Sequence, residues 1–203
     1  MHNNNHDHYF KLKNKVLDLI SNKSSIYLQF GFGNNIKPNF LNIDNDTHWC
    51  HDEMTRTKKD NVFIYDWLNQ QLPIEDNSVD FIFHEDFIEH LTQEQQIKFL
   101  AETCRILKPR HYHRINTPCL MQVLKLCDVT KGSNGIYNEW NRWGHLLLLN
   151  KDYLSSIACT LGYYRVFYLT KNVSLSNVDY GGDIRPLEDR DSLDGNIFAE
   201  LQK

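Results

Sequence analysis

The stretch of residues 26–44, IYLQFGFGNNIKPNFLNID, constrains the fold more than any other part of the chain. Its β-prone apolar start breaks at Gly31-Phe32-Gly33, where the missing side chains allow a sharp turn and a close approach to a ligand. A second apolar run, residues 40–43, ends in Asp44. A carboxylate at the tip of this strand is suited to accept hydrogen bonds from ribose hydroxyls. The stretch therefore predicts a nucleotide site, although a plain strand-to-helix turn is the alternative interpretation.

Two departures from the dinucleotide fingerprint make NAD an unfavourable ligand. Ile36 stands where the third glycine of G-x-G-x-x-G is required, and Asp44 follows Gly33 by 11 positions instead of the roughly 20 that a full strand-helix-strand unit needs. Pro38 also interrupts any helix between the two strands, so that at most one helical turn fits there.

The remaining pattern alternates between strands and helices. We expect strands at residues 26–30, 40–43, 62–65, 79–83, 112–116, 163–169 and 197–201, and helices at residues 9–20, from the Thr92–Gln95 capping box to Pro109, and at 151–161. Such alternation predicts an α/β layer fold with a mostly parallel sheet. Ligands bind at the carboxyl ends of the strands in folds of this kind. Asp44, Asp66 and the cluster His84-Glu85-Asp86 are all expected at that edge.

Length and charge limit the class of protein. The 203 residues predict a single domain, 1–203, in which residues 1–8, MHNNNHDH, form a disordered tail. A net charge of −4 argues against bulk binding to nucleic acid or to an anionic membrane. The chain has no apolar run of transmembrane length and no signal-peptide pattern at its start, and we expect a cytoplasmic protein.

The cysteine and histidine patterns predict no metal site and no disulfide framework. The five cysteines form no C-x-x-C pair, and buried, reduced thiols are the expected state. The histidines of the tail, and the group His48, Cys50 and His51, lack a second ligand pair at zinc spacing. A basic run from Lys108 to Arg114 is interpreted as a solvated turn, with a phosphate site as the alternative.

Several motifs in order resemble class I S-adenosylmethionine-dependent methyltransferases of the small type 11 kind. These motifs are LQFGFG, FLNID, YDWLNQQLPIEDNSVDFIF, EDFIEHL, AETCRILKP, RINTP and WGH. The resemblance implies a three-layer Rossmann-like fold whose seven-stranded, mostly parallel sheet has an antiparallel last strand. The chain departs from the family at Gln29, at Arg110-His111, where two glycines are usual, and at Cys119, where aspartate is frequent.

The resemblance also implies a cofactor, S-adenosylmethionine, and the residues that hold it. Phe30, Gly31 and Gly33 pass under its methionine part, and Asp44 holds the ribose. Asp66 and Trp67 border the adenine, and His84 lies at the edge of the methyl-transfer site. These assignments depend on the family pattern and not on spacing alone.

For an acceptor that is a hydroxyl, a general base would raise the rate by about 10²–10⁴-fold. The candidates are His145, His84, Asp86 and Glu85, and His145 closes an aromatic, glycine-containing segment, residues 128–145, that we expect to act as a lid. A packed structural histidine is the alternative for His145, and structural roles are favoured for Glu89 and His90.

The resemblance implies a methyltransferase for a small molecule, with a hydroxyl of a sugar or a sugar-derived metabolite as the expected acceptor. A non-catalytic cofactor-binding module is the alternative. We expect no nucleic-acid or membrane partner, and a homodimer stays open.

Overall fold

The chain is built on one seven-stranded sheet. The computed structural model describes residues 2–45, 59–126, 143–183 and 196–203. The strands are β1 (Tyr27–Phe30), β2 (Leu41–Asp44), β3 (Val62–Ile64), β4 (Val79–Glu85), β5 (Leu107–Pro118), β6 (Arg165–Tyr168) and β7 (Asn196–Gln202). Their order is β3-β2-β1-β4-β5-β7-β6. Strands β1 to β5 are parallel, and β7 runs antiparallel to both β5 and β6. The expected seven-stranded Rossmann-like fold with an antiparallel last strand is thus confirmed.

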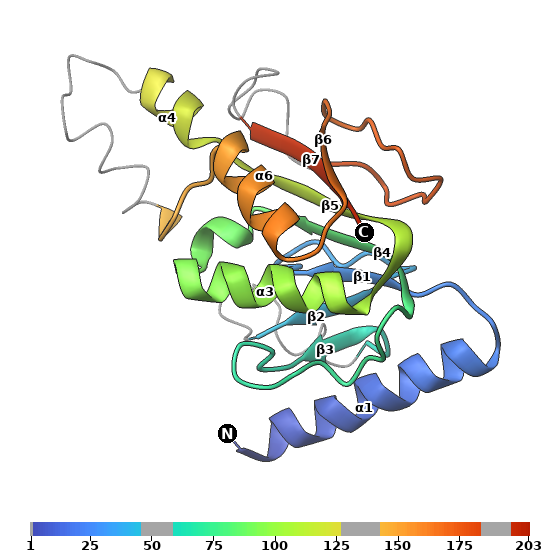
Figure 1. Cartoon of the computed structure of the whole chain (residues 1–203). Coiled ribbons are helices and arrows are strands. Elements are labelled where there is room, and N and C mark those ends of the chain that lie inside the picture. Colours follow the sequence, from blue (N-terminus) through green and yellow to red (C-terminus); the bar gives the residue numbers. More distant parts are fainter. Residues whose placement is uncertain (1, 46–58, 127–142, 184–195) are drawn as a thin grey trace.

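The main apolar core lies between this sheet and three helices. The helices of the described residues are α1 (His2–Ser21), α3 (Gln93–Ile106), α4 (Leu120–Leu126) and α6 (Lys151–Thr160), with a short 3-10 helix, η1 (Ile88–His90). Leu12 of α1, Leu100 of α3 and Leu154 of α6 are completely buried in the same core. Figure 1 shows α3 and α6 packed across the sheet and α1 running beside β3.

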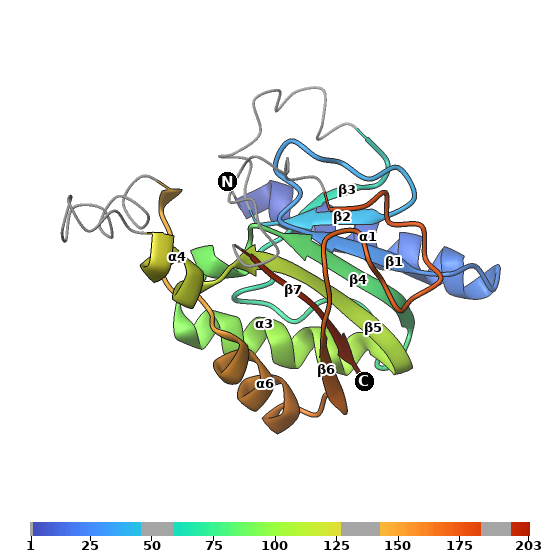
Figure 2. The same ribbon diagram turned by 90° about the horizontal axis from the view of Figure 1, so that it is seen from above.

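Loops cover the opposite face of the sheet. Phe81 and Phe83 of β4 pack there against Phe40 and Tyr180, in a second and smaller apolar cluster. Figure 2 shows the segment that contains residues 169–183 on the side of the sheet opposite to α3 and α6. Within the four described ranges, no helix lies on this face. The expected third layer is therefore formed by loops in this part of the chain.

Buried charges attach the loop of residues 169–183 to the sheet. The guanidinium of Arg114 pairs with Asp183 at 2.7 Å, and both side chains are completely buried. Arg114 also donates to the carbonyl oxygens of Val173 (2.8 Å) and Thr170 (3.2 Å). The carboxylate of Glu200 accepts hydrogen bonds from the Ser174 hydroxyl and the Leu175 amide. These polar contacts fix a loop that has no secondary structure of its own.

Lys37 provides a further attachment. Its ammonium donates to the carbonyl oxygens of Tyr180 and Gly182 and lies 4.5 Å from the centre of the Phe83 ring. Burial lowers the pKa of this lysine. Lys37 therefore joins the loop of residues 32–40 to the loop of residues 169–183, and the two loops together cover this face of the sheet.

The basic run is divided between two environments. His113 and Arg114 are completely buried in β5, on opposite faces of the sheet, whereas Arg110 is exposed. The interpretation of the whole run as a solvated turn is wrong for its last two residues, because strand alternation carries them into the interior.

Arg110 takes a left-handed backbone conformation, which glycine adopts more readily than other residues. Its φ is +68°, and its amide donates to the carbonyl oxygen of Lys203 at 2.7 Å. A side chain in this left-handed region costs roughly 1–2 kcal/mol. The turn lies at the amino end of the long β5 strand, away from the carboxyl ends. The departure at Arg110-His111 therefore affects the stability of the turn and leaves the opposite edge intact.

Several element boundaries differ from those expected. The capping box of α3 is confirmed, since the Thr92 amide donates to the Gln95 side chain at 2.9 Å and the Gln95 amide donates back at 3.3 Å. However, α3 ends at Ile106, before Pro109, which lies within β5. The helix α1 begins at His2, where a disordered tail was expected. The helix α4 was missed. Among the described helices, none has the length and apolar composition to cross a membrane.

Candidate cofactor and methyl-transfer site

The carboxyl ends of four strands are level at one edge of the sheet. Phe30, at the end of β1, is paired with Ile43 of β2 and with His84 of β4. Glu85 of β4 is in turn paired with Asn116 of β5. This edge is where ligands bind in open α/β sheets.

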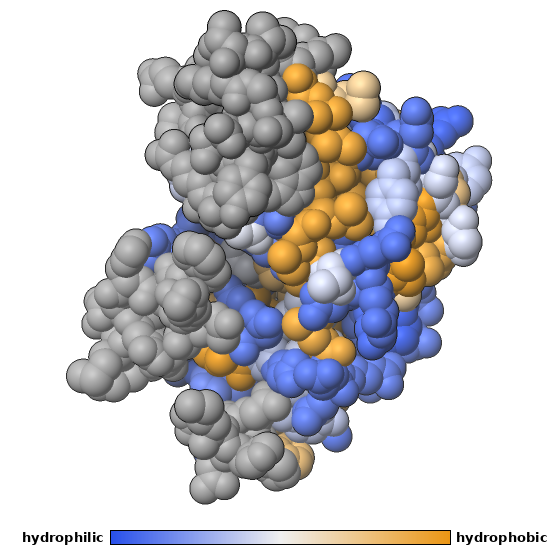
Figure 3. Space-filling view, turned by 90° about the vertical axis from the view of Figure 1, so that its left-hand side faces the viewer, coloured by the Kyte–Doolittle hydropathy of each residue, from blue (hydrophilic) through white to orange (hydrophobic). Residues whose placement is uncertain are grey.

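Figure 3 views the molecule from this side, where apolar residues form a band among polar ones. Exposed apolar side chains at this end of the fold include Met121, Leu124 and Leu146. An acceptor at this edge would thus meet both polar and apolar surface.

The glycine turn leaves β1 in a conformation that only glycine adopts freely. Gly31 has a φ of +59° and Gly33 a φ of +45°. A Cβ atom at Gly31 would lie 2.2 Å from the Phe87 ring, so the backbone passes directly against this side chain. At Gly33, by contrast, no described atom lies within 4 Å of the Cβ position. Gly31 is thus required by packing, and Gly33 is favoured by its positive φ.

Asp44 lies next to this turn. The Gly31 amide donates to the carbonyl oxygen of Ile43 at 3.1 Å, which joins the turn to the end of β2. The backbone carbonyl of Asp44 accepts from the Tyr65 amide at 2.7 Å, and its side chain is partly exposed. The backbone of Asp44 therefore lies beside the glycine turn, while its carboxylate accepts a hydrogen bond from the Asn45 amide at 2.9 Å. That this carboxylate holds a ribose stays a prediction.

The carboxylate of Asp66 has a structural role that the sequence pattern does not predict. It accepts hydrogen bonds from the Asn69 amide at 3.3 Å and from the Asn69 side chain at 2.9 Å. These contacts close the turn after β3. A contact with adenine would be an additional role.

Trp67 lies in the core, away from the open edge. The ring is 6% exposed and packs against Phe30, Phe87 and Phe99, with ring centres 5.0 to 6.2 Å apart. Trp67 thus supports the glycine turn from below, through Phe87. The side chain of Phe30 is also completely buried, which leaves only its backbone for a ligand.

His84 is likewise a core residue and not an accessible base. It is completely buried against Phe87, Phe99 and His113, and neither ring nitrogen has a hydrogen-bond partner among the described residues. Burial lowers the pKa of His84 to about 3, and burial also lowers the pKa of His113. The prediction that His84 lies at the methyl-transfer site is not supported, because strand alternation points this ring under α3.

His84 predicts a sensitivity of the fold to acid. Below pH 6.5 the unfolded chain protonates this histidine, whereas the folded chain does not until about pH 3. Its stabilising contribution is complete above pH 6.5, and it is lost as the pH falls, by up to about 1.4 kcal/mol per pH unit. When the pH is lowered from about 6 to about 4.5, the free energy of unfolding should therefore fall in both proteins. The fall should be about 2 kcal/mol smaller in His84→Leu than in the parent chain. Urea unfolding at several pH values measures this difference, and identical pH profiles would contradict it.

A second polar group, Glu89, His90 and His145, lies beyond β4. One ligand atom from each side chain falls within 4.8 Å of the others. Glu89 is completely buried and His145 is 4% exposed, while His90 is partly exposed. Glu89 and His90 were expected to be structural, and no pattern in the sequence indicates that His145, 55 positions after His90, joins them.

The other expected catalytic residue, Asp86, begins the segment that leads to this group. Its φ is +48°, and its amide donates to the carbonyl oxygen of Asn116 at 3.0 Å. The Asn116 side chain donates to Glu85 and accepts from Asn196.

The predicted lid, residues 128–145, falls almost entirely outside the described residues, as do His48, Cys50 and His51.

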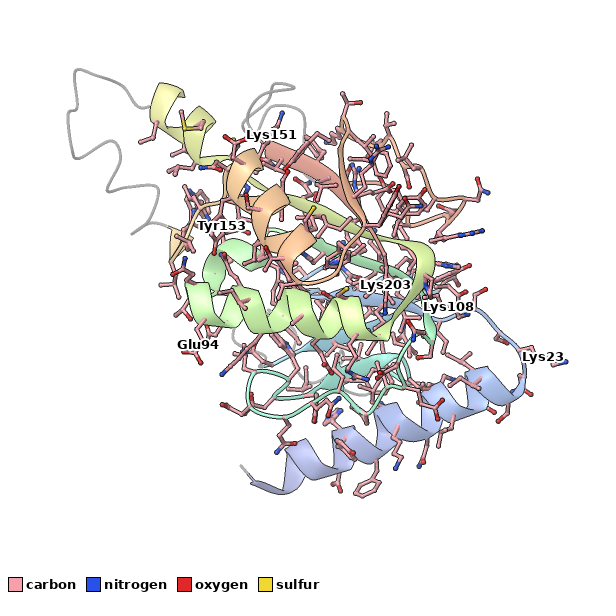
Figure 4. All side chains as sticks on the ribbon, in the orientation of Figure 1. Lys23, Glu94, Lys108, Lys151, Tyr153 and Lys203 are labelled. Carbon is pink, nitrogen blue, oxygen red and sulfur yellow. The ribbon has the colours of Figure 1, made fainter. Side chains whose placement is uncertain are left out.

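A separate hollow of about 450 Å³ lies at the opposite end of the strands, lined by residues that include Ile26, Ser78, Asp80 and Lys108. Figure 4 shows Lys23 and Lys108 at that end of the molecule, far from Tyr153 and Glu94. The Asp80 carboxylate there binds Lys108 at 2.7 Å and also accepts from the Ile26 amide at 2.9 Å. These contacts join β1, β4 and β5, and the hollow is distinct from the candidate site.

Comparison with known proteins finds a methyltransferase family and solved structures with the same fold. Residues 31–114 match the family described as Methyltransferase domain. No curated protein sequence matches the chain. A S-adenosylmethionine-dependent methyltransferase from Archaeoglobus fulgidus has the same fold, with a TM-score of 0.59 and 15% identity over 96% of this chain and 94% of that one.

Two further structures are similar to the chain. A methyltransferase from Thermotoga maritima gives a TM-score of 0.53 at 14% identity, over 97% of this chain and 92% of that one. Phosphoethanolamine N-methyltransferase 2 of Haemonchus contortus, in complex with S-adenosylhomocysteine, gives a TM-score of 0.49 at 17% identity over 77% of this chain. The chain spans only 38% of that protein's length.

The family match covers the glycine turn, Asp44 and the strands β2 to β4, and the sheet order is that of the similar structures. Residues 31–114 of the chain therefore match the methyltransferase-domain family, and the sheet has the fold of S-adenosylmethionine-dependent methyltransferases.

Proposed function

We propose that the chain transfers the methyl group of S-adenosylmethionine to an oxygen atom of a small molecule, with a sugar hydroxyl as the leading acceptor. The observation that carries the proposal is the glycine turn beside Asp44, at an edge where the ends of β1, β2, β4 and β5 are level. Gly31 and Gly33 pass under the methionine part of the cofactor, Asp44 accepts hydrogen bonds from the ribose, and Asp66 borders the adenine.

Methyl transfer is an in-line displacement at carbon. The acceptor oxygen attacks the methyl carbon, the carbon–sulfur bond breaks, and its electron pair returns to sulfur. Orientation of the two reactants contributes up to about 7–11 kcal/mol in reactions of this kind. His145 or Asp86 takes the acceptor proton. In support of this role, both lie on segments that follow the carboxyl ends of β4 and β5, and a buried carboxylate, Glu89, stands beside His145.

Asp44→Ala should weaken the binding of S-adenosylmethionine by roughly 1.5–3 kcal/mol, because a charge-assisted hydrogen bond to the ribose is lost. Titration calorimetry measures this change. Asp60→Ala is the matched control, since Asp60 is an exposed aspartate that precedes β3 at its other end. An unchanged affinity in a folded Asp44→Ala variant would remove Asp44 from the cofactor site.

The reaction itself is tested by incubating the chain with S-adenosylmethionine that carries a deuterated methyl group, together with fractionated metabolite extracts. We expect an acceptor that gains one labelled methyl group, and fragmentation of the product identifies the methylated atom. A labelled nitrogen would retain the methyltransferase and overturn the oxygen assignment. Cofactor binding without any transfer, across extracts rich in sugars, would favour the non-catalytic module.

A further inference from the structure

We propose that Glu89, His90 and His145 form a binding site for one divalent transition-metal ion at the acceptor side of the domain. Two imidazoles and one carboxylate are a ligand set typical of Zn²⁺, Fe²⁺, Mn²⁺ and Co²⁺. Their ligand atoms lie within 4.8 Å of one another. Atoms that bind one ion at about 2.0–2.2 Å are themselves about 3–4 Å apart. Small side-chain movements therefore close this group around an ion.

The hydrogen bonds around the group orient its side chains as in metal sites. The Nδ1 atom of His90 lies 3.2 Å from the carbonyl oxygen of Gly144. A carbonyl only accepts, so Nδ1 carries the proton and Nε2 keeps the lone pair that a metal needs. The hydroxyl of Thr117 donates to Oε2 of Glu89 at 2.9 Å, which holds this carboxylate in place. Contacts of this kind to non-ligand residues are the usual support of a metal ligand.

The backbone also fixes the distance between the two halves of the site. The amides of Leu146 and Leu147 donate to the carbonyl oxygen of Glu89, at 2.8 and 3.1 Å. The ring centres of His90 and His145 are 5.1 Å apart. His145 is therefore held against η1 by the main-chain hydrogen bonds of the two residues that follow it.

The partial exposure of the site allows exchange of an outer ligand. Glu89 and His145 are buried, whereas His90 is partly exposed, so the open side of an ion would face His90. The three ligands among the described residues leave at least one position for water or for a substrate oxygen. A structural site with four protein ligands would instead be closed.

The function of the ion rests on the function proposed above. A metal ion in this position would bind the acceptor hydroxyl and lower its pKa. Asp86, the candidate base that remains when His145 binds the ion, would then take the proton before the oxygen attacks the methyl carbon. The site would then favour acceptors with two neighbouring oxygens, which bind one ion together. Metal binding itself requires neither the cofactor nor the acceptor, and it can be tested separately.

The test is a titration of the 203-residue chain with Co²⁺, after dialysis against a chelator. The parent in this experiment carries His2→Asn, His6→Asn and His8→Asn, because histidines near the amino terminus bind metals by themselves. We expect one equivalent of Co²⁺ with visible absorption, displacement by Zn²⁺, and a higher melting temperature with the metal. Mg²⁺ should not compete, because it prefers sites made of oxygen ligands.

The variants Glu89→Gln, His90→Gln and His145→Gln should each weaken Co²⁺ binding at least about tenfold. The control is His111→Gln, which removes a histidine that also lies near a carboxylate, 3.5 Å from Asp80, at the other end of β4. Circular dichroism identifies any variant that does not fold, and asparagine (or aspartate at position 89) then replaces glutamine.

Two results would overturn the proposal: no stoichiometric binding by the parent, or less than a tenfold loss in any of the three folded variants. S-adenosylhomocysteine binding is measured on the same samples. A chain that binds this cofactor product but no metal contradicts the metal site alone, whereas a chain that binds metal but no cofactor product contradicts the proposed function.

Discussion

Replacing Asp183 with alanine should lower the free energy of unfolding by about 3–5 kcal/mol. The substitution leaves the guanidinium of Arg114 buried without its charged partner, and an uncompensated buried charge is costly. Both side chains of this pair are completely buried, and Asp183 also accepts from the Asn172 amide at 2.7 Å. The loss therefore affects both the sheet and the loop that covers it. Urea unfolding, followed by circular dichroism, measures the change.

Asp179→Ala is the control, because Asp179 is an exposed aspartate of the same loop whose carboxylate accepts a hydrogen bond from the Gly181 amide at 3.0 Å. It should change stability by no more than about 0.5 kcal/mol. The double variant Arg114→Met, Asp183→Leu removes both charges and should recover part of the loss. If Asp183→Ala lowers the free energy of unfolding no more than Asp179→Ala does, the buried ion pair does not stabilise the loop of residues 169–183 on the sheet.

Replacing His145 with alanine should lower turnover by about 10²-fold or more and leave cofactor affinity unchanged. The physical reason is that this side chain acts on the acceptor, as a base or as a metal ligand, and not on the cofactor. An effect confined to turnover is the mark of an interaction made in the transition state. Steady-state kinetics with the acceptor identified by methyl labelling, together with calorimetry for S-adenosylhomocysteine, separates the two quantities.

His111→Ala is the control for this experiment, because its ring lies at the amino end of β4. If His145→Ala keeps full turnover while Asp86→Ala abolishes it, the base follows β4 instead. Full activity in both variants would mean that positioning alone drives the reaction. His84→Ala is expected to act differently, through lower stability, because its ring is enclosed by Phe87, Phe99 and His113.

The sheet could be predicted because each strand has a local signal. The apolar runs, the glycine turn and the Thr92 capping box are contiguous in sequence, and their order determines the parallel core. The helix α4 was missed although Leu120, Val123 and Leu124 have helical spacing after Pro118. The loop cover could not be predicted, because its stability comes from contacts distant in sequence, such as Arg114 with Asp183 and Lys37 with Tyr180.

Only the backbone positions of the candidate site residues could be predicted from the sequence. Gly31, Gly33 and Asp44 follow strands directly, and the structure brings them together. Side-chain direction was not predictable at the ends of strands, where one residue changes the face. His84 and Trp67 both carry a ring nitrogen that can form hydrogen bonds, and both lie near the carboxyl ends of the strands. Both side chains nevertheless point into the core. The group around Glu89 depends on a partner 56 positions away, which no local pattern reveals.

The most direct measurement is a crystal structure of the chain grown with S-adenosylhomocysteine. The account predicts one molecule at the carboxyl edge, with its methionine part over Gly31 and Gly33 and its ribose hydroxyls within hydrogen-bond distance of the Asp44 carboxylate. Binding elsewhere, such as in the hollow lined by Asp80 and Lys108, or no binding at a saturating concentration, would contradict the account.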